Sequence, residues 1–242
     1  MMLEEMPSSK TAWNRNEKKE MGKKIIILGT AHGVNVGGKC SPDKKFREYK
    51  YSREIIKQLK AELESEGYKV FVDMEGDEVP ANQSKELEQR CIYVNQLCRQ
   101  YGTSNCIYVS IHVNAAGSEG KWMNAGGWCA YTSSGKTKAD ALATKLYEAA
   151  QVELSDYAKA LDAGKETGAY GENQRAFRTD YSDGDPDQES NFYVLSHTSC
   201  PAVLTENLFQ DNKADVAFLE SEKGRKAIVA LHKNGIINYL KS

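Results

Sequence analysis

The sequence predicts a single α/β domain with a twisted, largely parallel sheet flanked by helices. Strand-like segments alternate along the chain with longer segments of helical periodicity, which is typical of parallel strands joined by crossover helices. Two strand-like segments, residues 25–28 and 106–113, are almost continuously apolar, as strands covered on both faces are. We therefore expect the functional site at the carboxyl ends of the strands, where open parallel sheets bind their ligands.

Helical spacing and turn residues place the elements in order. Ile55, Leu59 and Leu63 repeat at helical spacing, and Gly67 stands where a helix commonly ends. Ser84 is the expected N-cap of the next helix. Residues 155–190 show no clear periodicity. The predicted strands cover residues 24–28, 69–74, 106–113, 127–131, 192–195 and 202–206, and the predicted helices cover 51–66, 84–101, 137–154, 213–219 and 222–240.

The composition is that of a folded, nearly neutral protein. Of 242 residues, 40% are hydrophobic and 27% are charged, and 32 basic against 34 acidic residues leave a net charge of −2. This balance argues against nucleic acid as a partner. Membrane insertion is not expected, because no apolar run approaches the roughly 20 residues of a bilayer span. We expect residues 23–242 to form one catalytic domain behind a loose polar arm over residues 1–22.

No segment has the apolar core of a secretory signal, which needs about 7–15 residues, so we expect synthesis in the cytoplasm. The six cysteines form no Cys-x-x-Cys pair. We expect them to be buried free thiols.

Several familiar motifs are only approximated. Residues 135–137, Gly-Lys-Thr, imitate the end of a phosphate-binding loop, but Ala130 stands where its first glycine belongs. Asp183, Asp185 and Asp187 lack the glycine and the final glutamate of a calcium loop, so a solvated acidic loop is expected there. A nucleotide-binding function therefore has little support.

Two of the four histidines and one glutamate fall at the expected carboxyl edge of the sheet. His32 follows the first strand, His112 lies near the end of an apolar strand, and Glu206 closes another buried strand. A core histidine is the plain alternative for His112, but a carboxylate placed like Glu206 needs a metal or a proton-transfer role. His197 is expected in a surface loop, and His232 as a cation near the end of the last helix.

Two histidines and a carboxylate with one open position are a known catalytic zinc set, and a further carboxylate can act as general base. Spacing alone leaves the third ligand open. Glu48 and Glu54 both lie near the start of a predicted helix, and compensation of the helix dipole also explains Glu48.

Taken in order, five segments resemble the zinc-dependent N-acetylmuramoyl-L-alanine amidases of the Amidase_3 type, over about residues 24–240. The resemblance favours Glu48 over Glu54, because the spacing to Gly67 fits that family. The matching segments are residues 25–33 (IIILGTAHG), Glu48 with the helix that ends at Gly67, 87–95 (LEQRCIYVN), 110–115 (SIHVNA), and 193–195 with 201–207 (YVL, PAVLTEN).

The resemblance implies one zinc ion per chain, held by His32, Glu48 and His112, with Glu206 as the catalytic carboxylate. It implies an enzyme that hydrolyses the amide between N-acetylmuramic acid and L-alanine, with peptidoglycan and muropeptides as its partners. A wall substrate combined with synthesis in the cytoplasm is typical of a phage or prophage endolysin or of a delivered effector. A host enzyme whose secretion signal has been removed is the alternative.

Three further residues are candidates for substrate contact. Asn114 belongs to the histidine-bearing strand segment of the family pattern, and Arg178 and Asp180 lie in the irregular stretch that we expect to line the groove.

The sequence departs from the family pattern without losing a proposed ligand. Residues 29–31, Gly-Thr-Ala, replace a turn that contains proline, Ser52 replaces an asparagine, and Asn207 follows Glu206 where glycine is usual. Two other functions stay open. One is a zinc peptidase or deacetylase acting on wall fragments, and the other is a non-catalytic module that binds peptidoglycan.

Overall fold

The computed structural model describes residues 24–242 except 118–119, 167–170 and 172, so the predicted arm over residues 1–22 lies outside the described residues. One seven-stranded sheet has the order β2-β1-β3-β7-β4-β5, with β6 paired to β4. The strands are β1 Ile25–Thr30, β2 Lys69–Val72, β3 Cys106–Asn114, β4 Gly126–Thr132, β5 Gln174–Phe177, β6 Gln188–Glu189 and β7 Ala202–Phe209.

The prediction of a largely parallel sheet in a single α/β domain is confirmed. The neighbouring strands β2, β1, β3 and β7 run parallel, whereas β4 runs antiparallel to β7 and parallel to β5 and β6. The carboxyl ends of β1, β3 and β7 therefore meet at one edge. Because β4 runs the opposite way, its first residue, Gly126, lies at that same edge.

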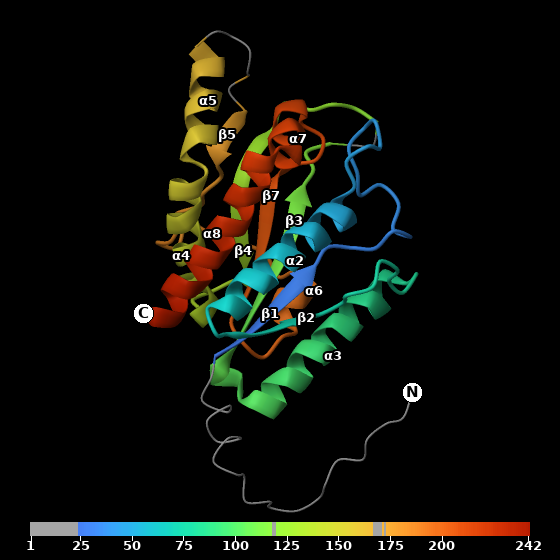
Figure 1. The fold of residues 1–242 in the computed structure, drawn as a ribbon, viewed down its shortest axis with the longest axis vertical. Helices are drawn as coiled ribbons and strands as arrows, with labels where there is room; N and C mark the ends of the chain where they lie inside the picture. Colours follow the sequence, from blue (N-terminus) through green and yellow to red (C-terminus); the bar gives the residue numbers. More distant parts are fainter. Residues whose placement is uncertain (1–23, 118–119, 167–170, 172) are drawn as a thin grey trace, which may run out of the picture.

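Helices cover both faces of the sheet (Figure 1). Residues of α2, α4, α5, α7 and α8 belong to the larger hydrophobic core, and those of α3 and α6 to a smaller core on the other face. The helices are α2 Glu48–Ser65, α3 Gln83–Tyr101, α4 Lys138–Glu153, α5 Ser155–Glu166, α6 Tyr193–Ser196, α7 Lys213–Glu220 and α8 Glu222–Lys241, with a 3-10 turn at Thr103–Asn105.

The aliphatic run of β1 is explained by this double cover. Ile26 and Leu28 point into the larger core, and Ile25 and Ile27 into the smaller one, because side chains alternate along a strand. All four are fully buried. The strand thus lies buried at the centre of the fold, and the residues that follow it, including His32, lie at the carboxyl edge.

Two parts of the element prediction are wrong. Residues 155–190, where no periodicity was expected, contain α5, β5 and the short β6. Residues 192–195 were expected to be a strand, but Tyr193–Ser196 forms the single turn of α6. Four apolar residues are too few to distinguish the period of a helix from that of a strand.

Two helix starts also differ from the prediction. The N-cap of α3 is Asn82, whose side chain accepts a hydrogen bond from Lys85 N, rather than Ser84. The helix α2 begins at Glu48, three residues earlier than expected, so Glu48 lies inside the helix.

The cysteines are free, and all except the half-buried Cys40 are buried, which supports the prediction of unpaired thiols. Among the described residues, no helix is long and apolar enough to cross a bilayer.

Candidate active site

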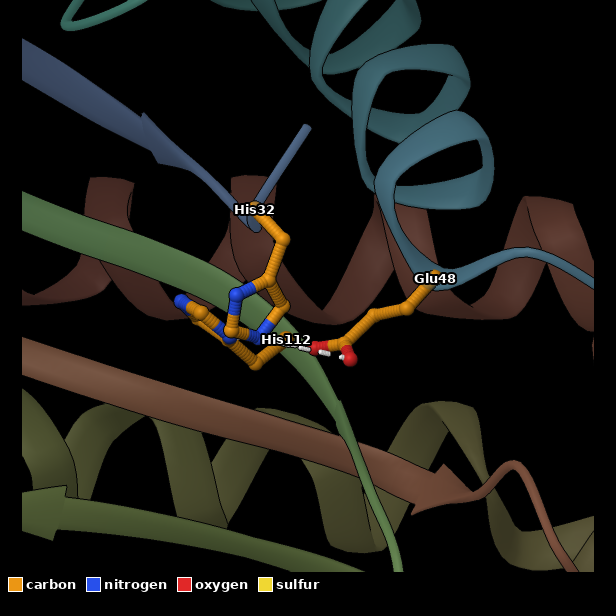
Figure 2. A group of neighbouring side chains, drawn as sticks. All are labelled: His32, Glu48 and His112. Carbon is orange, nitrogen blue, oxygen red and sulfur yellow. Dashed lines mark hydrogen bonds and ion pairs between the residues drawn. The ribbon is translucent and has the colours of Figure 1, made fainter. Parts of the chain in front are cut away.

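His32, Glu48 and His112 come together at the carboxyl edge of the sheet (Figure 2). One ligand atom from each lies within 4.8 Å of the other two. Nδ1 of His112 is 3.1 Å from Oε1 of Glu48, and Nε2 of His32 is 3.5 Å from Oε2. Three separate elements, the loop after β1, the first turn of α2 and the end of β3, therefore supply one cluster.

The first turn of α2 buries Glu48 against β3. Its side chain is directed at the histidines, and Oε1 also accepts a hydrogen bond from Val113 N at 3.1 Å. Glu48 is 2% exposed, so it does more than compensate the helix dipole. Glu54, the alternative left open by spacing, pairs with Arg225 instead.

The turn that carries His32 is held by the same helix. His32 has a φ of 40°, in the left-handed region that residues other than glycine seldom adopt. Arg53 of α2 fixes this turn, because its Nη1 donates to Ala31 O and its Nη2 to His32 O, both at 2.9 Å. The position of His32 is therefore tied to that of Glu48.

Burial and proximity give the cluster the protonation states that a metal requires. Burial lowers the pKa of His32 to about 3, although the charge of Glu48 acts to raise it, so the ring is neutral at pH 7. Burial acts to raise the pKa of Glu48, but the hydrogen bond from His112 and the two nearby rings lower it overall. A neutral imidazole and an ionised carboxylate are the forms that bind metals.

Glu206 lies beside the cluster. It pairs in register with His112 across β7 and β3, so the two side chains point to the same face of the sheet. Its Oε2 is buried and has no hydrogen-bond partner among the described residues. Burial, followed by the charge of Glu48, raises the pKa of Glu206 well above its ordinary value. Such a carboxyl group is suited to taking up and releasing a proton.

The donor set fits zinc. Two imidazole nitrogens and one carboxylate oxygen are a protein ligand set that catalytic zinc sites use, and they leave a fourth position for water or substrate. Within the described part of the chain, no other group of His, Cys, Asp or Glu brings three ligand atoms this close.

The other two histidines are placed differently. His197 is exposed after α6 and stacks on Tyr193 at 3.8 Å between ring centroids, as expected of a surface position. The prediction for His232 is wrong. It is fully buried, with Nε2 2.9 Å from Thr205 Oγ1 and Nδ1 2.7 Å from Ile228 O. Burial lowers its pKa to about 4, so it is a neutral core residue because α8 turns this face toward the sheet.

The acidic loop is not fully solvated. Asp187 is 2% exposed and accepts a hydrogen bond from Thr132 Oγ1 at 2.6 Å. Burial, together with a hydrogen bond to Asp185, raises its pKa to about 8. The expectation of a solvated carboxylate is therefore wrong for Asp187. The nearby Thr137 is the N-cap of α4, so residues 135–137, which resemble the end of a phosphate-binding loop, serve to begin this helix.

The amino-acid sequence matches the family described as N-acetylmuramoyl-L-alanine amidase (Amidase_3) over residues 26–238. The chain belongs to this family. The predicted resemblance is thereby confirmed over nearly the whole described structure.

Solved structures of amidases share the fold. The N-acetylmuramoyl-L-alanine amidase from Clostridium difficile 630 superposes with a TM-score of 0.67 at 20% identity, covering 91% of this chain and 98% of that one. The catalytic domain of CwlV, an amidase from Bacillus (Paenibacillus) polymyxa var. colistinus, gives 0.64 at 19% identity, covering 90% and 98%. At these identities the likeness establishes the fold.

A phage protein matches part of the sequence. The endolysin of Bacillus phage SPP1 is 41% identical over 54 residues, which make up 22% of this chain and 20% of the endolysin. The match therefore spans a fifth of that relative.

One departure from the amidase family pattern has a structural role that sequence reasoning missed. Ser52, which stands in place of an asparagine, is fully buried one turn after Glu48. Its Oγ accepts a hydrogen bond from Ala31 N at 3.0 Å and donates one to Ile111 O at 2.7 Å. In the sequence, the position of Ser52 four residues after Glu48 was the sign of this role. Its two hydrogen-bond partners, Ala31 N and Ile111 O, are known only from the fold.

The amidase fold places the three candidates for substrate contact in different surroundings. Asn114 ends β3, where its Oδ1 accepts a hydrogen bond from Ala115 N at 2.8 Å. Arg178 follows β5 and is half-buried near Gly126, at the carboxyl edge. Asp180 is exposed in the acidic loop, where its Oδ1 accepts a hydrogen bond from Ser182 N at 3.0 Å.

Proposed function

We propose that this chain hydrolyses the amide between N-acetylmuramic acid and L-alanine in peptidoglycan, with one zinc ion held by His32, Glu48 and His112. The observation that carries the proposal is the convergence of these three side chains at a buried edge, with Glu206 in register beside His112. Membership of the amidase family supports the substrate class.

Glu206 is the proton carrier of the proposed reaction. A bound zinc ion supplies polarisation of the scissile carbonyl and a lowered pKa for water at the site. Glu206 accepts a proton from the water that attacks the carbonyl carbon and donates it to the L-alanine nitrogen as the C–N bond breaks. The hydrogen bond from Val113 N orients the carboxylate of Glu48, and Arg53 fixes the turn that carries His32.

We further propose that the chain acts on the cell wall as an endolysin does. The partial match to the endolysin of Bacillus phage SPP1 supports this setting. Peptidoglycan and its muropeptide fragments are then the partners of the protein.

Digestion of purified peptidoglycan, followed by mass spectrometry of the products, tests the proposal. We expect stem peptides that begin with a free L-alanine amine and no new reducing sugar ends. A chelator should abolish their release and added zinc should restore it. His112→Ala should be inactive, whereas His197→Ala, which changes an exposed histidine, should keep full activity.

Other products would contradict the proposal in distinct ways. Cleavage inside the stem peptide would identify a peptidase, and release of acetate would identify a deacetylase. Binding without any cleavage by the zinc-loaded protein would identify a non-catalytic module.

A further inference from the structure

Arg178 holds its guanidinium at the edge of the sheet where the proposed zinc ligands lie. Its backbone N donates to Trp128 O at 2.9 Å, which continues the pairing of β5 with β4. Its Nη1 donates to Gly126 O at 3.3 Å, and its Cζ lies 5.5 Å from the centre of the Phe209 ring. Gly126 begins β4 and Phe209 ends β7, so both mark the carboxyl edge.

The pairing of the strands puts Arg178 on the same face as Glu206. Glu206 pairs with Cys129 across β7 and β4. Trp128 of β4 pairs with Phe177 of β5. Cys129 and Arg178 directly follow these two residues in the chain. Because side chains alternate between the faces of a sheet, those of Cys129 and Arg178 both point to the face opposite Trp128 and Phe177. One row across β3, β7 and β4 and the residue after β5 is thus formed by His112, Glu206, Cys129 and Arg178.

Among the described residues, the helices on the face of this row pack beside β1, β3 and β7 rather than beside β5. The helices α4 and α5, which pack beside β4 and β5, contribute to the larger core on the opposite face. On the face of the row, α3 and α6 contribute to the smaller core with β1, β3 and the first part of β7. Arg178 is accordingly half-buried, with part of its side chain open to solvent. Glu206 and Arg178 are both partly exposed, with the buried Cys129 between them, and we take a ligand bound at Glu206 to extend toward Arg178.

Arg178 has no acidic partner among the residues that the structure describes. Other arginines near the core do: Arg90 pairs with Asp73 and Glu86, and Arg225 with Glu54. A guanidinium carries five N–H donors, and one is used in the hydrogen bond to Gly126 O. A held, partly desolvated guanidinium with free donors is suited to a carboxylate, which it can bind through two parallel hydrogen bonds.

The spacing selects which part of the substrate can reach it. Neighbouring strands lie about 4.8 Å apart, so the backbones of Glu206 on β7 and Arg178 after β5 are separated by roughly 10 Å. The Arg178 side chain shortens this gap, because it reaches back to Gly126 on β4 and toward the Phe209 ring on β7. An extended peptide advances about 3.3–3.6 Å per residue, so a stem peptide with its scissile amide at Glu206 brings the residue after L-alanine within reach of the Arg178 guanidinium.

We propose that Arg178 binds a carboxylate on the residue that follows L-alanine in the stem peptide, and so selects substrates in which this group is free rather than amidated. The proposal rests on the proposed amidase function, because it takes the scissile amide to lie at Glu206. Arg178 is then a specificity-determining residue.

Two synthetic muramoyl peptides that differ only in this group, carboxylate or carboxamide, test the proposal. Wild type should cleave the carboxylate peptide with the higher kcat/KM. Arg178→Gln should lose roughly 10–100-fold in kcat/KM on the carboxylate peptide, mostly through KM, and little on the carboxamide peptide. Arg175→Gln, a matched change of an exposed arginine on β5, should leave both values unchanged. Equal losses on the two peptides, or no preference in wild type, would overturn the proposal.

A binding measurement separates this proposal from the amidase proposal. The two free stem peptides, without the sugar, are titrated calorimetrically into Glu206→Gln protein with and without Arg178→Gln. We expect the carboxylate peptide to bind more tightly than the carboxamide peptide only when Arg178 is present. Equal affinities for the two peptides with Arg178 present would overturn the role of Arg178, whether or not the wild type cleaves the wall.

Discussion

The Ser52 hydroxyl donates a hydrogen bond to the carbonyl of Ile111 at 2.7 Å and accepts one from the Ala31 amide at 3.0 Å. Ala31 immediately precedes His32, and Ile111 immediately precedes His112. Ser52 itself lies one turn after Glu48 on α2. One buried hydroxyl therefore fixes the spacing between all three proposed zinc ligands.

Loss of this hydroxyl should weaken metal binding more than it disturbs the fold. Ser52→Ala leaves the Ala31 amide and the Ile111 carbonyl without their partner, at a cost of about 1–3 kcal/mol in the free energy of unfolding. We expect zinc affinity to fall roughly 10–100-fold, as it does when groups that orient metal ligands are removed. Competition with a chromogenic chelator measures the affinity. Ser65→Ala, an exposed serine at the end of the same helix, is the control, and equal affinities in the two variants would contradict the role of Ser52.

Arg90 balances two buried carboxylates behind the His32 turn. It donates to Asp73 Oδ2 at 2.7 Å and to Glu86 Oε1 at 2.9 Å, and Asp73 in turn accepts from Thr30 N at 2.9 Å. Arg90→Met should lower the free energy of unfolding by about 3–5 kcal/mol, because it leaves buried negative charge without compensation. Urea denaturation measures this loss. The exposed Arg99→Met should change stability little, and a similarly small change in Arg90→Met would show that the network is not needed.

Asp187 should make the protein less stable as the pH rises. The unfolded chain releases this proton near pH 4, whereas the folded protein holds it until about pH 8, because burial raises the pKa of Asp187. Between these values the unfolded state binds fewer protons, so increasing pH favours unfolding. Asp187→Asn should therefore gain stability relative to wild type at pH 8 and much less at pH 5. Thermal denaturation at both pH values checks this, with Asp183→Asn as the control, and a gain independent of pH would contradict the assignment.

The site residues that were predicted from the sequence could be recognised from their immediate neighbours in the chain. His112 stands in a continuous apolar segment, and Glu206 closes the predicted strand over residues 202–206, so each could be placed near the carboxyl edge from its neighbours alone. The observed β7 continues past Glu206 to Phe209. Glu48 needed the family resemblance, because Glu54 is equally close to the start of the predicted helix at residue 51. The fold then separated them, since Glu48 faces the histidines and Glu54 pairs with Arg225.

The parts that were not predicted depend on contacts between distant residues. Ser52 is 21 residues from Ala31 and 59 from Ile111, and no periodicity along α2 reveals such partners. His232 was expected to be a cation near the end of the last helix. Its burial was not predicted, because it follows from how α8 packs rather than from its place near a helix end. The segment after α4 escaped prediction because the buried residues of α5, Tyr157 and Leu161, are too few to show a period.

Turnover and zinc content of Glu206→Gln, measured on the same preparation, test the central claim most directly. The substitution keeps the size of the side chain but removes its ability to take up a proton, so turnover of muropeptides should fall by at least roughly 10²–10⁴-fold. One zinc ion per chain should remain bound, as in wild type and in the exposed control Glu88→Gln. Near-normal turnover would contradict the role of Glu206 as proton carrier, and loss of zinc together with turnover would show that Glu206 is a ligand instead.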